Sequence, residues 1–360
     1  MPARLALLDS RPALSDLDGT TLEHWAETNG QPRYRARQLY SALHRRYVQS
    51  LDEVTELPVA LRSALVQEYR VRTLETRVHL RSSDRSEKVL FGLADGQTVE
   101  TVLIRGRNAG GTRRNTVCVS SQVGCPAGCT FCATGLSGFG RNLTGSEIAD
   151  QVIYFAHQLA LEGDRVTNVV YMGMGEPLLN VGAVSASVER LTDAKGINLG
   201  RRSITISTVG IVPQLRRFSE WAGQTNLAVS LHAPNDELRS RLVPYNRHFP
   251  IADLIAAVRD YTDETRRRVS FEYVLLHGVN DSMEIGRGLV ALLKPFGGYA
   301  HVNLIPWNPF RDGHFVRSEG PDADAFAGLL RAGGLRATIR YSRGLDISAA
   351  CGQLRERRSG

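Results

Sequence analysis

The amino-acid sequence predicts an α/β fold whose core is a series of parallel strand–helix units, closed or partly closed as a barrel. Two observations predict it. After residue 115, short runs rich in β-branched residues alternate with longer stretches of amphipathic helical spacing. Short polar motifs also follow these runs directly, as expected where the carboxyl ends of parallel strands meet at one edge. The predicted strands are "NTVCVSS", "VTNVVYMG", "RSITIST", "NLAVSLH", "VSFEYVLL" and "AHVNLIPW", with "RATIRYS" as a possible seventh.

Two smaller regions precede this core. Residues from about 20 to 75 are predicted to form a small basic helical module. Its apolar side chains recur at helical spacing, at Ala36, Leu39, Tyr40 and Leu43. The segment "LPVALRSALVQEY" repeats the pattern, with Pro58 near the expected helix start. The period then changes in "KVLFGLADGQTVETVLIRGR", which alternates around Asp95-Gly96 and predicts a β-hairpin.

The chain is basic. It has 360 residues and a formal net charge of +7, and arginines recur in "RYRARQLY", "RGRNAGGTRRN", "ETRRRV" and "RERRSG". Because arginine pairs bidentately with phosphate, one interpretation is a surface that binds nucleic acid. The other is a solvated basic surface without a partner. The length allows one large domain with an appendage, or two domains.

Nothing in the sequence indicates a membrane or a secreted protein. No apolar run reaches the ~18 residues that a membrane helix needs. The apolar patch from Leu5 to Leu8 is broken by Asp9 and Arg11, so no signal peptide is expected. Five cysteines are few and odd in number for this length, which disfavours a secreted disulfide framework. We therefore expect a cytoplasmic protein with no membrane partner.

Three cysteines form a compact motif. Cys125, Cys129 and Cys132 have the spacing C-x3-C-x2-C in a loop rich in Gly and Pro. Zinc usually takes four protein ligands, and the next candidate, Cys118, belongs to the preceding predicted strand. Three thiolates can instead bind three irons of a [4Fe–4S] cluster and leave the fourth iron open for a chelating cofactor. The alternatives are a zinc site and three buried thiols that pack as small hydrophobic groups.

Polar residues that follow the predicted strands are candidates for a binding site. Each has an ordinary structural alternative. Glu176 fits a helix N-terminus, where the dipole favours a carboxylate. Ser207 fits a helix cap, and His232 fits a hydrogen-bonded core histidine. Their shared placement at one edge of the predicted sheet favours the binding site for the set.

The cysteine loop after the first barrel strand, with "GMGEP" after the second, resembles the radical SAM superfamily. There a [4Fe–4S] cluster cleaves S-adenosylmethionine to a 5′-deoxyadenosyl radical. The resemblance then narrows to the RlmN/Cfr family of rRNA adenine methyltransferases, over about residues 20 to 355. Seven motifs support it in order: "CVSSQVGC", "FCATG", "RNLT", "NVVYMGMGEPLLN", "SLHAPND", "NLIPWNPF" and "DISAACGQL".

The resemblance implies a partial (β/α)6 radical SAM barrel with an N-terminal helical module and a short β-hairpin extension. The expected boundaries are 1–75 for a basic RNA-binding module, 76–110 for the hairpin, 111–346 for the core and 347–360 for a C-terminal loop. The implied cluster ligands are Cys125, Cys129 and Cys132. The implied contacts to S-adenosylmethionine are Gly175, Glu176, Ser207, Ser230, Leu231, His232 and Asn308.

The remaining two cysteines also have a role by resemblance. C2 of adenine is electron-poor and cannot attack the methyl group of S-adenosylmethionine directly. A radical route is needed, and it can be split into steps that use a protein sulfur. The family mechanism makes Cys351 the methyl acceptor, to be brought to the cofactor by a mobile loop. Its S-methyl group, activated by the radical, adds to adenine, and Cys118 then releases the RNA by forming a transient disulfide. Glu100 is the implied base for the C2 proton; a solvent-facing strand carboxylate is its alternative.

The resemblance implies methylation of C2 of adenine 2503 in 23S rRNA, and of adenine 37 in tRNA. The nearest alternative is the Cfr reaction at C8 of the same rRNA base. An alternative of another class is a non-catalytic RNA-binding protein with a structural iron–sulfur or zinc site, which would not use Cys118 and Cys351. We also expect one cluster per chain, two molecules of S-adenosylmethionine per turnover, an external electron donor such as flavodoxin or ferredoxin, and a monomer.

Overall fold

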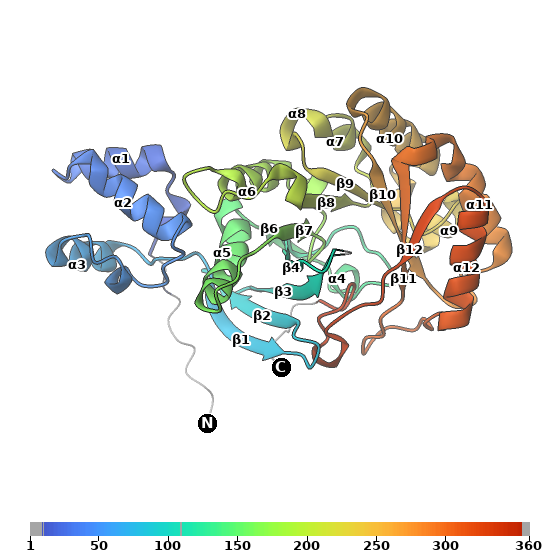
Figure 1. The fold of residues 1–360 in the computed structure, drawn as a ribbon, viewed down its shortest axis with the longest axis horizontal. Coiled ribbons are helices and arrows are strands. Elements are labelled where there is room, and N and C mark those ends of the chain that lie inside the picture. Colours follow the sequence, from blue (N-terminus) through green and yellow to red (C-terminus); the bar gives the residue numbers. More distant parts are fainter. Residues whose placement is uncertain (1–8, 10, 109, 355–360) are drawn as a thin grey trace.

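The computed structural model of the chain describes residues 9, 11–108 and 110–354. A helical module lies beside a larger body of strands and helices (Figure 1). The apolar patch at residues 5–8 and the basic run at residues 355–360 lie outside the described residues. None of the described helices is both long enough and apolar enough to span a membrane.

The predicted barrel is confirmed, including its possible seventh strand. One sheet has the strand order β1-β2-β3-β4-β7-β8-β9-β10-β11-β12. The strands from β4 to β12 in this order are parallel. Helices separate them along the chain, as the sequence predicted. The strands of this parallel part are β4 (Arg113–Cys118), β7 (Asn168–Tyr171), β8 (Ile204–Thr208), β9 (Asn226–Ser230), β10 (Val269–Leu275), β11 (Ala300–Pro306) and β12 (Arg336–Ile339).

The hairpin is also present, but it is not a separate appendage. β2 (Glu87–Gly92) and β3 (Thr98–Arg107) are antiparallel around the predicted Asp95-Gly96 turn. β1 (Glu75–Arg81), which the sequence analysis missed, pairs with β2, and β3 pairs with β4. The antiparallel part and the barrel therefore share one hydrogen-bonded sheet, because the open edge of β3 is satisfied by β4.

The helices follow their sequence signals. α5, for example, begins with a capping box between Thr144 and Glu147 and buries Ile148, Val152, Phe155 and Leu159 along one face. The described helices are α1 (Gly19–Thr28), α2 (Arg33–His44), α3 (Val59–Glu68), α4 (Ala133–Leu136), α5 (Gly145–Leu161), α6 (Val181–Thr192), α7 (Val212–Arg216), α8 (Phe218–Ala222), α9 (Asp236–Leu242), α10 (Ile251–Thr265), α11 (Met283–Leu293) and α12 (Gly320–Ala332).

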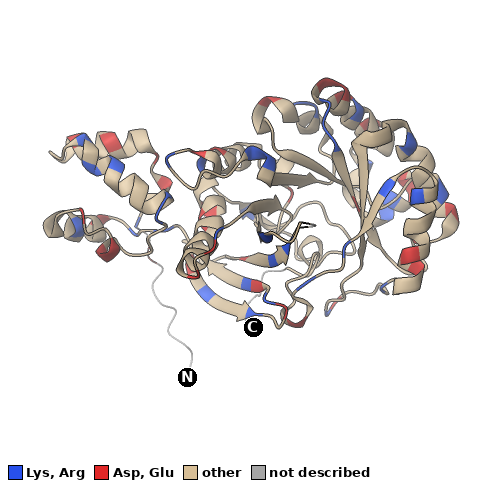
Figure 2. Cartoon of the chain, in the orientation of Figure 1, with Lys and Arg blue, Asp and Glu red and all other residues tan. Residues whose placement is uncertain are grey.

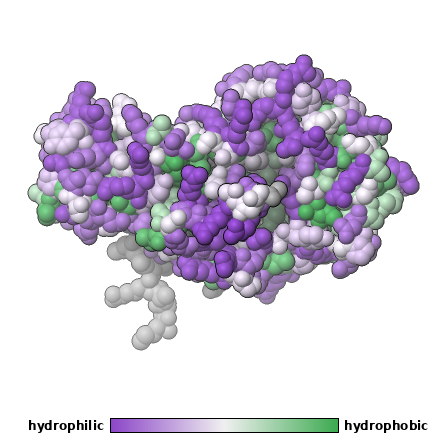
Figure 3. Space-filling model, viewed as in Figure 1, coloured by the Kyte–Doolittle hydropathy of each residue, from purple (hydrophilic) through white to green (hydrophobic). Residues whose placement is uncertain are grey.

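The helical module, α1 to α3, has its own apolar core, and a buried carboxylate of the barrel helps to attach it. Asp150 of α5 accepts hydrogen bonds from the Ser15 hydroxyl (2.6 Å), from the backbone and hydroxyl of Thr73 (2.8 Å each) and from Arg72 (3.2 Å). Lys and Arg are spread over both parts (Figure 2), and the face seen in Figure 3 is mainly hydrophilic.

Candidate active site

Inside the barrel is a cavity of about 230 Å³ that brings together cysteines far apart in the sequence. It is lined by the C-terminal ends of the parallel strands and by the segment around Cys351. All predicted site residues line it except Leu231 and Glu100. Those that do are Cys118, Cys125, Cys129, Cys132, Gly175, Glu176, Ser207, Ser230, His232, Asn308 and Cys351.

The cysteine loop is held by a small hairpin that the sequence analysis did not predict. β5 (Gln122–Gly124) and β6 (Phe139–Asn142) pair on either side of the loop, and Cys125 donates its N–H to the Gly138 carbonyl at 2.7 Å. Gly135 lies so close to the loop that a Cβ there would be 2.7 Å from the Cys129 carbonyl oxygen. Only glycine lets this helix turn approach the loop.

The thiols of this loop fit an iron–sulfur cluster. Burial raises the pKa of Cys125 to about 12, and burial together with the neighbouring Cys132 and Cys125 thiols raises the pKa of Cys129 well above its usual value. Thiolates so close together in an apolar site need a cation between them. A [4Fe–4S] cluster supplies that charge with three ligands from one loop, whereas a structural zinc site would need a fourth.

Glu176 is both a helix-terminal carboxylate and a residue of the cavity. One oxygen accepts the Leu178 N–H at 2.9 Å and the other accepts the Val209 N–H at 2.8 Å. Burial raises the pKa of this carboxyl to about 7. The preceding Gly175 has φ of +104°, and a Cβ there would lie 2.7 Å from the Gln122 Cβ. The "GMGEP" turn thus needs glycine to lie against the loop after β4.

The C-terminal ends of β8 and β9 place polar groups at the same cavity. Ser207 lies within β8, so the helix-cap alternative is wrong, and its hydroxyl is 3.4 Å from that of Ser230. His232 accepts the Val274 N–H on Nδ1 at 3.0 Å, which leaves the proton on Nε2. Burial lowers the pKa of His232 to about 3, so the ring is neutral.

The sequence analysis missed Arg239, which is 1% exposed. Its guanidinium donates to the carbonyls of Leu231 (3.1 Å), Ser230 (3.0 Å) and Val209 (2.5 Å), and so fixes the ends of β8 and β9. Leu231 itself is buried and outside the cavity lining; its contribution here is this backbone carbonyl. An Arg in "DELRSRL" looks like a surface residue, and nothing in the sequence distinguishes it.

Cys118 and Cys351 both line the cavity. Cys118 ends β4, and the Cys351 carbonyl accepts a hydrogen bond from the Asn308 side chain at 3.0 Å. Ala133 donates to the Gly352 carbonyl at 2.8 Å. The expected mobile loop is therefore already seated here, tied to the cysteine loop. Burial raises the pKa of Cys118 to about 12, and burial and the Cys118 thiol raise the pKa of Cys351.

Glu100 lies outside the cavity lining but is not the solvent-facing carboxylate that was its alternative. It is 3% exposed, and its carboxylate is 2.9 Å from the Lys88 ammonium. Lys88 also donates to the Ser348 carbonyl at 3.0 Å. The hairpin therefore connects Glu100 with the segment that ends in Cys351. A further cavity carboxylate, Glu272 of β10, was not predicted; Asn303 donates to it at 2.7 Å.

Comparison with known families agrees with this geometry. Residues 119–285 match the Radical SAM superfamily, and residues 13–71 match the ribosomal RNA large subunit methyltransferase N-terminal domain. The first match spans the cysteine loop and the strands from β7 to β10; the second spans the helical module. The Radical SAM superfamily implies a [4Fe–4S] cluster and S-adenosylmethionine, which the cavity residues fit.

Similar proteins extend over nearly the whole chain. A protein of Thermosynechococcus vestitus named "Probable dual-specificity RNA methyltransferase RlmN" is 47% identical, covering 93% of this chain and 96% of its own length. A Bacillus subtilis protein of the same name is 42% identical, covering 98% and 95%. The crystal structure of a radical SAM methyltransferase from Sphaerobacter thermophilus is 48% identical, with a TM-score of 0.90, over 96% and 99% of the two chains. The chain belongs to the RlmN family of radical SAM RNA methyltransferases.

Proposed function

We propose that this enzyme methylates C2 of adenine 2503 in 23S rRNA, and of adenine 37 in tRNA, through Cys351 and Cys118. One observation supports the proposal most directly: the two thiols line the same cavity as the three-cysteine loop, although 233 positions separate them in the sequence. A non-catalytic RNA-binding protein would have no use for this pair. The names of the curated relatives, which include dual-specificity RNA methyltransferases, support an RNA substrate.

Each cysteine has a distinct task in the proposal. Cys125, Cys129 and Cys132 hold the cluster, and Glu176, Ser207, Ser230 and His232 hold S-adenosylmethionine. When bound, these groups supply the methyl group and the radical that activates it. Cys351 accepts the methyl group on its sulfur and becomes bonded through that carbon to the adenine. The Cys118 thiolate then attacks the Cys351 sulfur, which forms a disulfide and breaks the sulfur–carbon bond. The carbon keeps the electron pair of that bond and takes up a proton, which completes the methyl group and frees the RNA.

Glu100 is the proposed acceptor of the C2 proton. Its buried carboxylate lies 2.9 Å from the Lys88 ammonium, and Lys88 links it to the Cys351 segment. The carboxylate does not line the cavity without substrate, so the proposal requires the hairpin or the RNA to bring adenine and Glu100 into contact.

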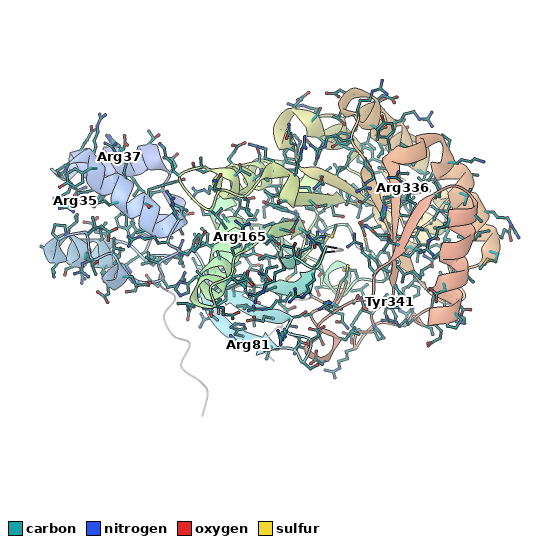
Figure 4. All side chains as sticks on the ribbon, viewed as in Figure 1. Arg35, Arg37, Arg81, Arg165, Arg336 and Tyr341 are labelled. Atoms are coloured by element: carbon teal, nitrogen blue, oxygen red, sulfur yellow. The ribbon has the colours of Figure 1, made fainter. Side chains whose placement is uncertain are left out.

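The helical module is proposed to bind RNA. The proposed domain boundaries remain at residues 75, 110 and 346, as in the sequence analysis. A groove of about 1120 Å³ separates the module from the barrel. Arg37 and Arg45 line it from the module and Lys195 and Arg201 from the barrel side, together with the carboxylates of Asp18, Glu23, Glu189 and Asp193. Arg37 and Arg201 lie beside Glu23 and Glu189, so contacts to a phosphate backbone would fall mainly to Arg45 and Lys195. Figure 4 labels Arg37 on this module.

The remaining proposals follow the same reaction. We propose one [4Fe–4S] cluster per chain, two molecules of S-adenosylmethionine per turnover, a low-potential donor such as flavodoxin or ferredoxin, a cytoplasmic location and a monomeric enzyme. The radical step needs the external electron, and methyl transfer and hydrogen abstraction each use one molecule of the cofactor.

The test is nucleoside mass spectrometry of a 23S rRNA fragment incubated anaerobically with reconstituted enzyme. 2-Methyladenosine is expected, and tRNA is assayed in parallel. 8-Methyladenosine would replace the proposal with the Cfr reaction, which none of the comparisons favours. If enzyme with a full complement of iron methylates neither RNA, the proposed function is wrong.

A further inference from the structure

The segment that carries Cys351 lies against the turn between β1 and β2. The Asp84 carboxylate of this turn accepts the Gly344 N–H at 2.8 Å. In return, the Asp346 carboxylate of the segment accepts the Ser82 hydroxyl at 2.6 Å and a backbone N–H of the same turn at 3.2 Å. Figure 1 shows the segment, in dark red, beside the tip of this hairpin. Each partner therefore supplies one carboxylate to the other, across about 260 positions of sequence.

A further contact joins β2 to the same segment closer to Cys351. The buried Lys88 ammonium, 2.9 Å from the Glu100 carboxylate, donates to the Ser348 carbonyl at 3.0 Å. Ser348 has φ of +52°, a left-handed conformation that persists where the surrounding contacts hold it. The hairpin thus fixes the backbone three residues before Cys351. We call these contact residues the hairpin clamp: Ser82, Asp84 and Lys88 on the hairpin, and Gly344, Asp346 and Ser348 on the segment.

The segment is compact between the hairpin clamp and Cys351. It contains the short 3-10 helix η7 (Leu345–Ile347), and Ala349 donates its N–H back to the Gly344 carbonyl at 2.8 Å. Gly344 has φ of +68°, and a Cβ there would lie 2.8 Å from the Ala349 Cβ. Ala349 and Ala350 are both buried. Because residues 344–349 form one closed turn, a shift of the segment at the clamp also shifts Cys351.

Different elements hold the other side of Cys351. The Asn308 side chain, which follows β11, donates to the Cys351 carbonyl at 3.0 Å. Ala133, in the first turn of α4, donates to the Gly352 carbonyl at 2.8 Å. Cys351 therefore lies between two attachments, one to the hairpin and one to the barrel and the cysteine loop. The first is built from residues that do not line the cavity.

The placement of Cys351 matters because its proposed reaction is a methyl transfer between two sulfur atoms. The Cys351 thiolate attacks the methyl carbon of S-adenosylmethionine, and the electron pair of the broken carbon–sulfur bond goes to the departing sulfur. Such a transfer depends steeply on how the reacting atoms approach, and a misplacement of about 1 Å can cost about 100-fold in rate. Cys351 is in neither a helix nor a strand, so its position depends on the contacts of the segment.

We infer that the hairpin clamp positions Cys351 for methyl transfer, with Asp84 and Asp346 as positioning residues that act through the backbone of the segment. The inference rests on the proposed function, because it concerns the sulfur that accepts the methyl group there. It gives the hairpin a task in the step that needs no RNA, in addition to the proposed role of Glu100 in the RNA step. A clamp that only stabilised the fold would lower the melting temperature and leave the rate of this first step unchanged.

The test measures methylation of Cys351 without RNA and without a reductant. The protein is produced under iron depletion, so that Cys351 starts unmethylated, and is then reconstituted anaerobically and mixed with saturating S-adenosylmethionine. Mass spectrometry of the peptide that contains Cys351 gives the rate. The clamp variant is Asp84→Ala/Asp346→Ala.

The matched control is Asp164→Ala/Asp281→Ala, which also removes two carboxylates that accept backbone N–H groups. Asp164 accepts the Arg165 N–H at 2.8 Å. Asp281, like Asp346, accepts a serine hydroxyl and a backbone N–H, at 2.8 and 3.0 Å. Iron content, melting temperature and the Kd for S-adenosylmethionine are measured for every variant.

The clamp variant should methylate Cys351 at least about tenfold more slowly than wild type, with unchanged iron content and Kd, and the control should stay within about twofold. Asp346→Asn, which keeps an oxygen to accept the Ser82 hydroxyl, should be faster than Asp346→Ala. A wild-type rate in the clamp variant, or an equal loss in both double variants, overturns the inference while the proposed function stands. If wild type leaves Cys351 unmethylated, the proposed function fails and the inference falls with it.

Hydrogen exchange gives a second measurement that does not depend on turnover, for the case in which the double variant holds too little iron. In the reconstituted single variant Asp346→Ala, the peptide that covers residues 344–350 should exchange its amide hydrogens several-fold faster than in wild type, because the Ala349 N–H is protected by the closed turn. Peptides of α1 should exchange at the wild-type rate. Unchanged exchange in residues 344–350 would show that Asp346 does not hold the segment, and would overturn the inference.

Discussion

The two edges of the barrel are built on the same strands and differ in almost every chemical respect. At the C-terminal edge, thiols, serines and a neutral histidine are buried around a cavity of about 230 Å³. At the N-terminal edge, Arg165, Arg202, Arg268 and Arg336 are exposed. Burial at the first edge makes each group depend on its neighbours, whereas exposed charges act through a screened field. Substitutions should therefore act all-or-none at one edge and gradually at the other.

The strongest test of the buried edge is the cysteine loop. Cys125→Ala, Cys129→Ala and Cys132→Ala should each lose essentially all iron, because a cluster left with two protein ligands is poorly held. Anaerobic reconstitution followed by iron and sulfide analysis measures this. The expected wild-type content is about four irons per chain. Stoichiometric zinc without iron uptake in the wild type would overturn the assignment of this loop.

Substitutions of Cys351 and Cys118 should block the reaction at two different steps. Cys351→Ala removes the methyl acceptor, so neither protein nor RNA gains a methyl group. Cys118→Ala still allows Cys351 to become bonded to RNA but cannot release it, so the chain should remain attached. A denaturing gel with and without ribonuclease shows the adduct as a nuclease-sensitive shifted band.

The double variant Cys118→Ala/Cys351→Ala is the control for that adduct, and it should give no shifted band. Normal turnover by Cys118→Ala would show that this thiol is not needed. RNA methylation by Cys351→Ala would remove the covalent route altogether.

A smaller effect, on stability, is expected from substituting Lys88 of β2, whose ammonium joins the hairpin to the Cys351 segment. Lys88→Met removes the ammonium beside the buried Glu100 and the hydrogen bond to Ser348. Breaking a buried ion pair costs about 3–5 kcal/mol. Arg217→Met, which breaks the exposed pair with Glu220, should cost less than about 1 kcal/mol. Urea unfolding of both variants measures the difference, and equal losses would contradict the contrast between buried and exposed charges.

The smallest effect should come from a single exposed arginine at the N-terminal edge. Arg268→Gln should change the free energy of unfolding by less than about 0.5 kcal/mol, because the side chain is exposed. Urea unfolding measures this. A loss as large as that of Lys88→Met would mean that the N-terminal edge is as interdependent as the cavity.

Much of this molecule could be predicted from sequence because its signals are local. Buried parallel strands appear as β-branched runs, and glycines mark close approaches such as Gly175 against Gln122. The cysteines of the loop are adjacent in the chain. Even Cys118 and Cys351, which are far apart, were identified by resemblance and lie in one cavity.

The missed features depend on partners that the sequence does not place. Arg239 and Glu272 look like surface residues until three carbonyls and Asn303 are seen around them. β1 has charged residues on its exposed face and is fixed only by pairing with β2. Likewise, the sequence pattern at residues 76–110 did not indicate that β3 would pair with β4 and so join the hairpin to the barrel sheet.

The strand lengths described above have a consequence for the shape of any RNA that reaches the cavity. β10 has seven residues, which at about 3.3 Å each separates the two edges by roughly 20 Å. One nucleotide does not span that distance between its phosphate and its base, so an adenine in the cavity cannot keep its phosphate at the N-terminal edge. A stacked, base-paired adenine cannot enter the cavity, so a loop or an extruded nucleotide is required. Backbone geometry would then select RNA by its local flexibility before any base is read.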